Sequence, residues 1–224
     1  MSRSVILLSG GLDSAANLAI CAVQDEPVLC LTADYGQRAA AREIEAAREL
    51  SRYYGVEHRV LRIEWLGQLG GSSLTDVSRE MPAPQSGTLD DLKSSLETAK
   101  AVWVPNRNGV LINAAAAFAE SLGCAQVVVG FNREEAATFP DNSADFTARA
   151  TRALELSTAN HVRVACYTLM QDKREMVATL SKLEKPFPFD MTWSCYEGGL
   201  ERCGVCESCQ RFARAMGQTV KRSC

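Results

Sequence analysis

The fold is decided by one short segment, Ser9-Gly10-Gly11-Leu12-Asp13-Ser14, which lies between an apolar run at residues 5–9 and a helical pattern at residues 12–22. A strand that turns directly into a helix places the free backbone N–H groups of the first helical turn at the turn itself. Two glycines let a ligand approach that backbone closely, and the helix dipole favours an anion there. The segment is therefore a candidate phosphate loop, although it also fits a Gly-Gly turn in which Ser14 or Asp13 caps the helix.

Four further apolar or β-branched runs follow this loop and alternate with helical patterns. The runs occupy residues 28–32, 58–63, 126–130 and 162–168, and further helical patterns occupy residues 38–54 and 108–122. Gly55 and Gly123 stand at the ends of these two helices, where glycine is the usual C-terminal cap. Strands that alternate with helices form parallel sheets. We therefore predict an α/β fold with a parallel five-stranded sheet and helices on both faces.

The composition indicates one main domain with a small appendage. The chain has 224 residues, of which 46% are hydrophobic and 23% charged, and this suits one sizeable core rather than two independent domains. We place the main domain at residues 1–190 and the appendage at residues 191–224. Residues 65–104 are rich in Gly, Ser and Pro, so we expect a mobile lid over the functional site or a flexible insertion there.

The charge balance argues against a nucleic-acid partner. The 24 Lys and Arg residues are outnumbered by 27 Asp and Glu residues, so the net charge is -3 and no whole-chain positive field attracts a polynucleotide. The apolar run at the N-terminus is too short for a signal peptide or a membrane span. We expect a cytoplasmic protein that acts on small molecules, without a membrane or direct nucleic-acid partner, and with a homodimer as a possible assembly.

The nine cysteines divide into two groups. Cys21, Cys30, Cys124 and Cys166 lie singly in apolar segments, as small buried hydrophobes do. The other five lie in the last thirty residues, and four of them, Cys195, Cys203, Cys206 and Cys209, are closely spaced. Four thiolates at this spacing predict a structural zinc site. An iron–sulfur cluster is the main alternative, and unreactive buried cysteines are a second one.

The glycine-containing loop differs from two common nucleotide-binding loops. It lacks the Gly-Lys-Ser/Thr end of a Walker loop and the spacing of GxGxxG, so neither γ-phosphate transfer nor a dinucleotide fits it well. It resembles instead the SGGxDS loop of the PP-loop ATP pyrophosphatase superfamily. That resemblance implies a Rossmann-like fold of the adenine nucleotide alpha hydrolase type, with ATP whose pyrophosphate leaves when a substrate oxygen attacks the α-phosphate. Mg²⁺ is the expected partner of ATP, with Asp13 as its ligand directly or through water.

Further strings follow the loop along the chain. They are Asp34-Tyr35-Gly36-Gln37-Arg38, Val104-Pro105-Asn106-Arg107-Asn108, Gly130-Phe131-Asn132, Phe139-Pro140-Asp141, Asp172-Lys173 and Trp193-Ser194-Cys195-Tyr196. Together with the loop and the cysteines they resemble the 7-cyano-7-deazaguanine synthase family over nearly the whole chain, except residues 65–104. The chain departs from the pattern of many members at Asn106, where they have Gly, and at residues 138–142, where Thr-Phe-Pro-Asp-Asn replaces Gly-Tyr-Pro-Asp-Cys.

The resemblance implies an ATP-dependent carbon–nitrogen ligase of queuosine biosynthesis. Such an enzyme converts 7-carboxy-7-deazaguanine and ammonia to 7-cyano-7-deazaguanine, through an adenylated carboxylate and then an amide whose oxygen is activated in turn. The residues that we expect to contact ATP are Leu8, Ser9, Gly10, Gly11, Leu12, Asp13, Ser14, Asp34, Tyr35 and Gln37. The resemblance also assigns structural Zn²⁺ to Cys195, Cys203, Cys206 and Cys209.

Two cations are expected in the site, because an anionic carboxylate must approach an anionic ATP. We assign Arg107 to the carboxylate and Lys173 to the step that expels pyrophosphate, with Asp13 and Ser14 as the other catalytic residues. The alternative is that Arg107 pairs with a structural carboxylate and that Lys173 is an exposed first-turn residue. The amidine-like edge of the base offers paired N–H donors to a carboxylate, for which Asp141 is the first candidate and Glu134 the second.

Three other functions fit parts of the sequence. A relative of the synthase would stop at the amide, or would attach a deazaguanine to an amine of another protein. A tRNA-modifying PP-loop enzyme uses the same loop, but it needs an RNA-binding surface or catalytic cysteines near the ATP site. The non-enzymatic alternative is a zinc-stabilised binding module in which the loop is only a capped turn.

Overall fold

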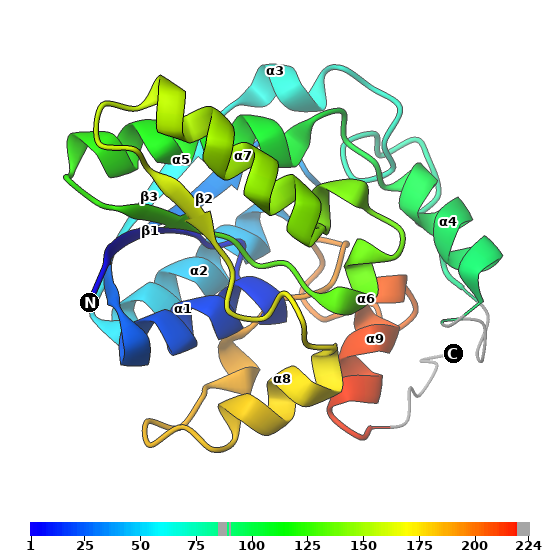
Figure 1. Ribbon diagram of the computed structural model, residues 1–224. Helices are drawn as coiled ribbons and strands as arrows, with labels where there is room; N and C mark the ends of the chain where they lie inside the picture. The colour runs from blue at the N-terminus through cyan, green and yellow to red at the C-terminus, as the bar shows by residue number, and fades with distance from the viewer. Residues whose placement is uncertain (85–88, 90, 219–224) are drawn as a thin grey trace.

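The computed structural model describes residues 1–84, 89 and 91–218, with a five-stranded sheet at its centre (Figure 1). The strands are β1 (Arg3–Leu7), β2 (Glu26–Asp34), β3 (Glu57–Arg62), β4 (Gln126–Val128) and β5 (Arg163–Ala165). They lie in the order β3-β2-β1-β4-β5, and all neighbouring pairs are parallel, which confirms the predicted sheet. The order switches sides between β1 and β4, and open α/β sheets bind ligands beyond the carboxyl ends of such a pair.

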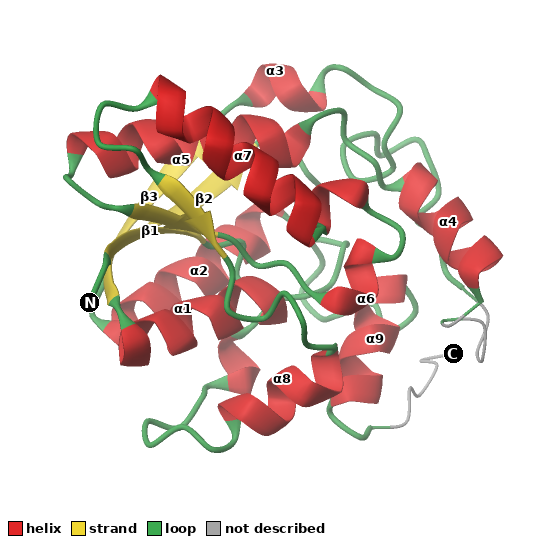
Figure 2. Cartoon of the chain, viewed as in Figure 1, coloured by secondary structure: helices red, strands yellow, loops and turns green. Residues whose placement is uncertain are grey.

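Helices cover both faces of the sheet, as predicted (Figure 1, Figure 2). One face carries α1 (Leu12–Gln24), α2 (Ala40–Tyr54) and α8 (Lys173–Leu180), and the other carries α5 (Arg107–Ser121) and α7 (Ala144–Ser157). Neighbouring residues of β1 pack into the two hydrophobic cores, one on each face of the sheet. Ile6 packs in the cluster of α1 and α8, whereas Val5 packs in the cluster of α5 and α7, because successive strand side chains point to opposite faces.

The helix ends follow the sequence closely, whereas three strands end early. The observed bounds of α1, α2 and α5 lie within two residues of the predicted ones, and Gly55 ends α2 with φ 71°. However, β1 ends at Leu7, short of the predicted residue 9. The strands β4 and β5 end at Val128 and Ala165, short of the predicted residues 130 and 168. Beyond these points the chain leaves the ladder, and the Thr168 hydroxyl donates to the Phe131 carbonyl at 2.7 Å. The two segments therefore turn together at the carboxyl edge of the sheet.

The segment 65–104 begins within a short helix, α3 (Glu64–Gly67), and contains α4 (Leu92–Ala101). Its residues 85–88 and 90 lie outside the described part of the chain. Four of its apolar side chains are buried in one cluster with Tyr35: Leu66, Leu74, Val102 and Val104. The Arg38 N–H donates to the Leu74 carbonyl at 2.8 Å, which holds this segment beside the end of β2. Its role as a lid stays a prediction.

The C-terminal segment packs on the sheet domain through α9 (Glu207–Ala215). Phe212 of α9 lies in the same core cluster as the buried residues of α1 and α8. Ahead of α9, the Trp193 N–H donates to the Gly10 carbonyl at 2.8 Å. The segment that contains the cysteines is thus joined directly to the glycine loop. Three short elements complete the chain: α6 (Arg133–Ala136), η1 (Pro140–Asn142) and η2 (Phe189–Met191).

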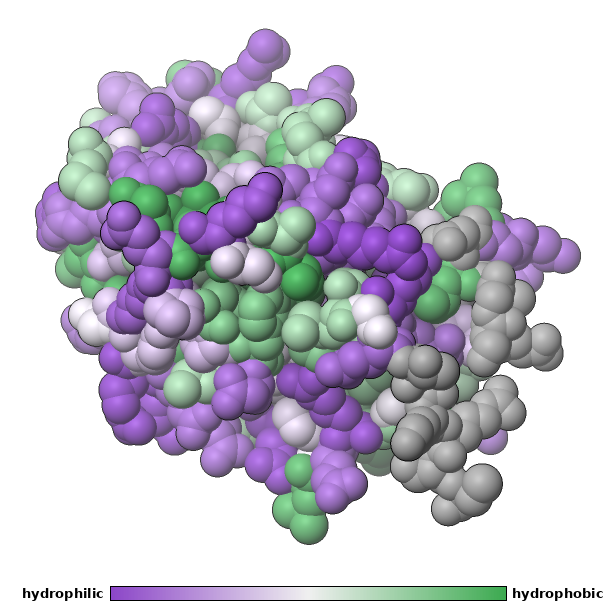
Figure 3. Space-filling model, turned by 90° about the horizontal axis from the view of Figure 1, so that it is seen from below, coloured by the Kyte–Doolittle hydropathy of each residue, from purple (hydrophilic) through white to green (hydrophobic). Residues whose placement is uncertain are grey.

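No helix in the part of the chain that the structure describes is both long and apolar enough to cross a bilayer. Figure 3 shows one face of the molecule, on which hydrophilic residues are spread widely with hydrophobic residues between them.

Candidate active site

A cavity of about 240 Å³ lies at the carboxyl edge of the sheet. Its walls come from the ends of β1, β2 and β4, from α2 and α5, and from the segment before the cysteines. The residues with apolar side chains that line it include Leu7, Leu31, Ala33, Leu111 and Ile112. The polar residues that line it include Ser9, Asp13, Ser14, Glu43, Arg107 and Glu135. The cavity therefore offers both apolar and strongly polar contacts to a ligand.

The glycine loop leaves the start of α1 open toward this cavity. The N-cap residue of α1 is Gly11, which has no side chain to cap the helix. The alternative interpretation, in which Ser14 or Asp13 caps the helix, is therefore wrong. The Ser14 hydroxyl instead accepts the Ser9 N–H at 3.2 Å and donates to the Gly11 carbonyl at 3.1 Å. Ser14 thus fixes the loop from inside. An N-terminal helix end of this kind binds anions such as phosphate.

Two glycines allow this loop to pack closely. Gly10 has φ 81°, and a Cβ there would lie 2.8 Å from both the Glu43 carbonyl oxygen and the Ala46 Cβ of α2. A Cβ at Gly130 would lie 2.6 Å from the Ser14 backbone. Any larger residue would separate the loop from α2 or from the end of β4, so both glycines are needed for the shape of the site.

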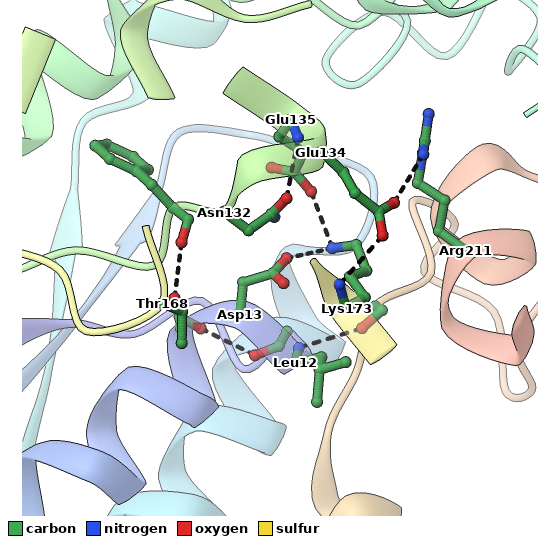
Figure 4. Close-up of polar contacts among 12 residues, drawn as sticks. Leu12, Asp13, Asn132, Glu134, Glu135, Thr168, Lys173 and Arg211 are labelled. Atoms are coloured by element: carbon green, nitrogen blue, oxygen red, sulfur yellow. Dashed lines mark hydrogen bonds and ion pairs between the residues drawn. The ribbon is translucent and has the colours of Figure 1, made fainter. Parts of the chain in front are cut away.

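Lys173 lies between two carboxylates, as Figure 4 shows. Its Nζ is 2.5 Å from Asp13 Oδ2 and 3.0 Å from Glu135 Oε1, and Lys173 is only 6% exposed, so it is not the exposed first-turn residue of the alternative interpretation. An Asp172 and Glu175 capping box fixes the start of α8 and so places Lys173. The Asn132 side chain accepts the Glu135 N–H at 2.9 Å and fixes the other partner.

The charges in this group are unequal, because one lysine faces two carboxylates. Burial would lower the pKa of Lys173, but Asp13 and Glu135 together raise it, so Lys173 stays charged. Burial raises the pKa of Asp13 to about 6 despite Lys173. Burial also opposes ionisation of Glu135, but Lys173 and Asn132 more than offset it and lower its pKa. Asp13 Oδ1 is buried without a hydrogen-bond partner in the described part of the chain, which suits a cation ligand.

Arg107, at the start of α5, lines the same cavity from the other side. Its Nη1 donates to the Tyr35 hydroxyl at 3.4 Å. Burial alone would lower the pKa of Arg107, but Tyr35, Asp141 and Glu43 raise it, so the guanidinium remains charged. No carboxylate within ion-pair distance neutralises it in the described residues, so its charge remains available to an anionic ligand.

The two carboxylates predicted to bind the base are not among the residues that line the cavity. Glu134 turns toward α9, where its Oε2 lies 2.9 Å from Arg211, and its Oε1 accepts the Lys173 N–H at 3.1 Å (Figure 4). The same Oε2 lies 2.8 Å from Arg214. Asp141 lies in η1 near Arg107, and it is the next residue, Asn142, that lines the cavity. The structure therefore brings Arg107, Asp13 and Ser14 to one cavity, with Lys173 directly behind Asp13, and leaves Glu134 outside it.

The residues predicted to bind ATP divide into those that line the cavity and those that do not. Those that line the cavity are Leu8, Ser9, Gly11, Asp13, Ser14, Tyr35 and Gln37. Leu12 is in the core, Gly10 packs on α2, and Asp34 accepts the Gly36 N–H at 3.2 Å. Sequence reasoning missed Glu43 and Glu135. For Glu43 a signal existed, because it precedes Ala46, Ala47 and Leu50 on the buried stripe of its helix.

The four predicted cysteines meet in one cluster. The sulfurs of Cys195, Cys203, Cys206 and Cys209 all lie within 4.8 Å of one another, and the Cys203 and Cys209 sulfurs are 3.9 Å apart. Tetrahedral zinc–thiolate bonds place sulfurs about 3.8 Å apart. The Glu197 and Cys203 N–H groups donate to Cys195 Sγ at 3.4 and 3.3 Å. The closeness of the four sulfurs means that the cluster can hold a metal.

Comparison with known proteins gives one consistent result. The family model described as "Queuosine biosynthesis protein QueC" matches residues 3–220. Three curated relatives are all named 7-cyano-7-deazaguanine synthase. The protein from Desulforamulus reducens is 49% identical over 95% of this chain and 92% of its own, and that from Desulforudis audaxviator is 51% identical over 95% and 96%. The protein from Methanosarcina mazei is 46% identical over 95% and 93%.

Proposed function

The chain belongs to the QueC family of queuosine biosynthesis proteins, and from this membership we propose that it is an ATP-dependent ligase that makes 7-cyano-7-deazaguanine from 7-carboxy-7-deazaguanine and ammonia. The relatives carry the name of that synthase over almost their whole length. The observation that carries the proposal is the single cavity in which the glycine loop and Arg107 face the same space. One end suits phosphates, and the other offers a cation to a carboxylate.

The reaction needs ATP twice, first to adenylate the carboxylate and then to activate the oxygen of the amide that ammonia forms. Both steps release pyrophosphate, so the site must stabilise the negative charge that builds up on this leaving group as its bond to the α-phosphate breaks. The start of α1 supplies positive potential at that end. Lys173 is outweighed by its two carboxylates, so we assign it the orientation of Asp13 rather than a direct attraction for phosphate. Ser14 keeps the loop in shape through the Ser9 N–H and the Gly11 carbonyl.

Asp13 is proposed as a ligand of the Mg²⁺ that accompanies ATP. Its Oδ2 contacts Lys173, which leaves the buried Oδ1 to a cation. When bound, Mg²⁺ neutralises phosphate charge. Lys173 then orients the Asp13 carboxylate from behind and holds Glu135 in the same group.

At the other end of the cavity, Arg107 is proposed to bind the substrate carboxylate. Tyr35 supports the guanidinium at 3.4 Å, and Tyr35 is itself buried. A carboxylate held between Arg107 and the glycine loop has its oxygen directed toward the ATP end, which is the arrangement that adenylation requires. Asp141, beside Arg107, contributes to holding the Arg107 charge.

Zn²⁺ is proposed as the metal of the cysteine cluster, in a structural role. The four cysteines supply a complete tetrahedral set, and a substrate-open position would need a ligand other than these four. We further propose that the protein acts in the cytoplasm without direct nucleic-acid binding, and that residues 65–104 act as a lid. Leu74 and Val102, which line the cavity from this segment, support the last point.

The test is an assay of purified protein with 7-carboxy-7-deazaguanine, ATP, Mg²⁺ and ammonia, with products identified by mass. We expect the nitrile and release of pyrophosphate. Accumulation of the amide alone would identify an amide-forming relative, and an adduct on a supplied protein amine would identify a conjugating enzyme. Absence of pyrophosphate release with every carboxylate tested would favour a binding module instead.

A further inference from the structure

Helix α2 carries a carboxylate on its core-facing stripe. Glu43 lies three, four and seven residues before Ala46, Ala47 and Leu50, and those three are buried. Carboxylates are seldom placed on such a stripe, because burial of a charge is costly unless a partner compensates it. Burial accordingly raises the pKa of Glu43. Its side chain does not enter the core but lines the cavity.

A buried polar residue, Gln37, fixes the position of Glu43. The Gln37 Nε2 donates to Glu43 Oε2 at 2.8 Å and to the Ala33 carbonyl at 3.0 Å. The Gln37 Oε1 accepts the Tyr35 N–H at 3.0 Å, and Gln37 is only 5% exposed. All the hydrogen-bonding groups of the Gln37 side chain are therefore used to hold one carboxylate in one orientation.

The remaining acceptor positions of Glu43 are unused by the protein. Within residues 1–84, 89 and 91–218, no group donates to Oε1, and no Lys, Arg or His lies within ion-pair distance of Glu43. An ionised carboxylate accepts at both oxygens, and Gln37 occupies one of about four lone-pair positions. The cavity thus presents a fixed acceptor that a ligand with N–H donors would satisfy.

The chemistry of the two proposed ligands distinguishes which of them fits this acceptor. The amidine-like edge of a guanine-type ring carries a ring N–H beside an exocyclic amino group, so two donors face a carboxylate together. The corresponding edge of adenine has an amino group beside an unprotonated ring nitrogen, whose lone pair repels a carboxylate. Apolar residues of the lining, which include Leu31, Ala33 and Ile112, suit a flat ring such as adenine that makes no contact with a carboxylate.

We propose that Glu43 is the residue that selects the deazaguanine ring, by accepting the N–H groups of its amidine-like edge, and that Gln37 is its positioning residue. The inference rests on the proposed function, which supplies the substrate class. It takes the place of Glu134 as a base-binding residue, because Arg211 and Arg214 already neutralise Glu134 away from the cavity.

The test compares E43Q with the matched control E45Q. Both remove one carboxylate from α2, but Glu45 is exposed and pairs with Arg42 at 3.0 Å on the surface. For E43Q we expect the KM for 7-carboxy-7-deazaguanine to rise roughly 10- to 100-fold, as expected for loss of hydrogen bonds to a charged acceptor. The KM for ATP should change less than about threefold. The E45Q variant should match the wild type in both constants.

A second measurement uses an analogue of the substrate without the exocyclic amino group. The wild type should bind this analogue roughly tenfold or more weakly than 7-carboxy-7-deazaguanine by calorimetry, and E43Q should lose most of that discrimination. Equal wild-type affinity for the two compounds would overturn the proposal, even if E43Q failed to fold. So would an E43Q defect confined to ATP. Because this binding assay needs no turnover, it separates the two failures: a chain that makes no nitrile but binds the ring with this discrimination would contradict the proposed reaction and keep the role of Glu43.

Discussion

The glycine loop and the cysteine cluster lie side by side but are built in opposite ways. The loop is contiguous, from Leu8 to Ser14, and its polar residues Ser9, Asp13 and Ser14 line a cavity. The cluster joins Cys195 to a later group at residues 203–209, and its four sulfurs face one another. An open group of polar atoms suits a ligand that binds and leaves, whereas a closed set of thiols suits a metal that stays. Substitutions should therefore affect catalysis in the first region and stability in the second.

The largest effect is expected from Asp13→Ala. We expect kcat/KM for pyrophosphate release to fall roughly 100- to 1,000-fold, because the variant loses the proposed Mg²⁺ ligand and disturbs the orientation of Lys173. The measurement is steady-state pyrophosphate release with 7-carboxy-7-deazaguanine, ATP and ammonia. Near-normal release by this variant would contradict the assignment of the loop.

The thermal stability of Asp13→Ala is the control for this prediction. Lys173 keeps Glu135 at 3.0 Å, so its charge remains paired. Burial raises the folded pKa of Asp13 to about 6, which means that ionised Asp13 opposes folding at pH 7. This cost begins to fall as the pH drops through 6, and it is gone only below the ordinary pKa of 3.8. The variant should therefore be at least as stable as the wild type at pH 7, and this difference should shrink toward pH 5.

The next effect is expected from Cys206→Ser in the cluster. Because a structural metal site converts binding energy into folding energy, we expect loss of bound metal and destabilisation by about 4 kcal/mol or more. For a chain of this size, that lowers the unfolding midpoint by roughly 8 to 16 °C. Elemental analysis should find one zinc per wild-type chain and none in the variant, with Cys124→Ala as a control that keeps its zinc. Iron in the wild type would refute the zinc assignment.

The five strands, the helices α1, α2 and α5, and both regions could be predicted because each depends on local sequence, whereas α7 was not among the predicted helices. The loop lies between one strand and one helix, and the cysteine spacing alone indicates a four-thiolate site. The orientation of neighbouring carboxylates could not be predicted in this way. Glu134 and Glu135 are adjacent on a helix of four residues, yet Glu135 forms an ion pair with the Lys173 ammonium and Glu134 forms one with the Arg211 guanidinium. Their partners are 38 and 77 residues away in sequence, so only tertiary packing determines which one faces the cavity.

A smaller effect is expected where the two regions touch. The Leu12 N–H donates to the Ser194 hydroxyl at 3.3 Å, one residue before Cys195. Ser194→Ala removes this connection but leaves all four sulfurs. We expect the KM for ATP to rise about 2- to 10-fold, the cost of one neutral hydrogen bond, with unchanged zinc content. Loss of zinc in this variant would show that metal binding by the cysteine cluster depends on its contact with the glycine loop, against the division between catalysis and stability.

The smallest effect is expected from Cys166→Ala, which tests whether a cysteine outside the cluster takes part in catalysis. Burial raises the pKa of Cys21, Cys124 and Cys166, and it raises that of Cys30 to about 12. A thiol with a raised pKa is a poor nucleophile, because the thiolate is the reactive form. Cys166 is the strictest test, because Asp13 contributes to its raised pKa and its Sγ lies 3.7 Å from the Thr168 hydroxyl at the edge of the site. We expect kcat within about threefold of the wild type, because adenylation by positioned groups requires no covalent intermediate on the protein. Complete loss of turnover in a variant with a wild-type unfolding midpoint would instead place a nucleophilic cysteine in the open region.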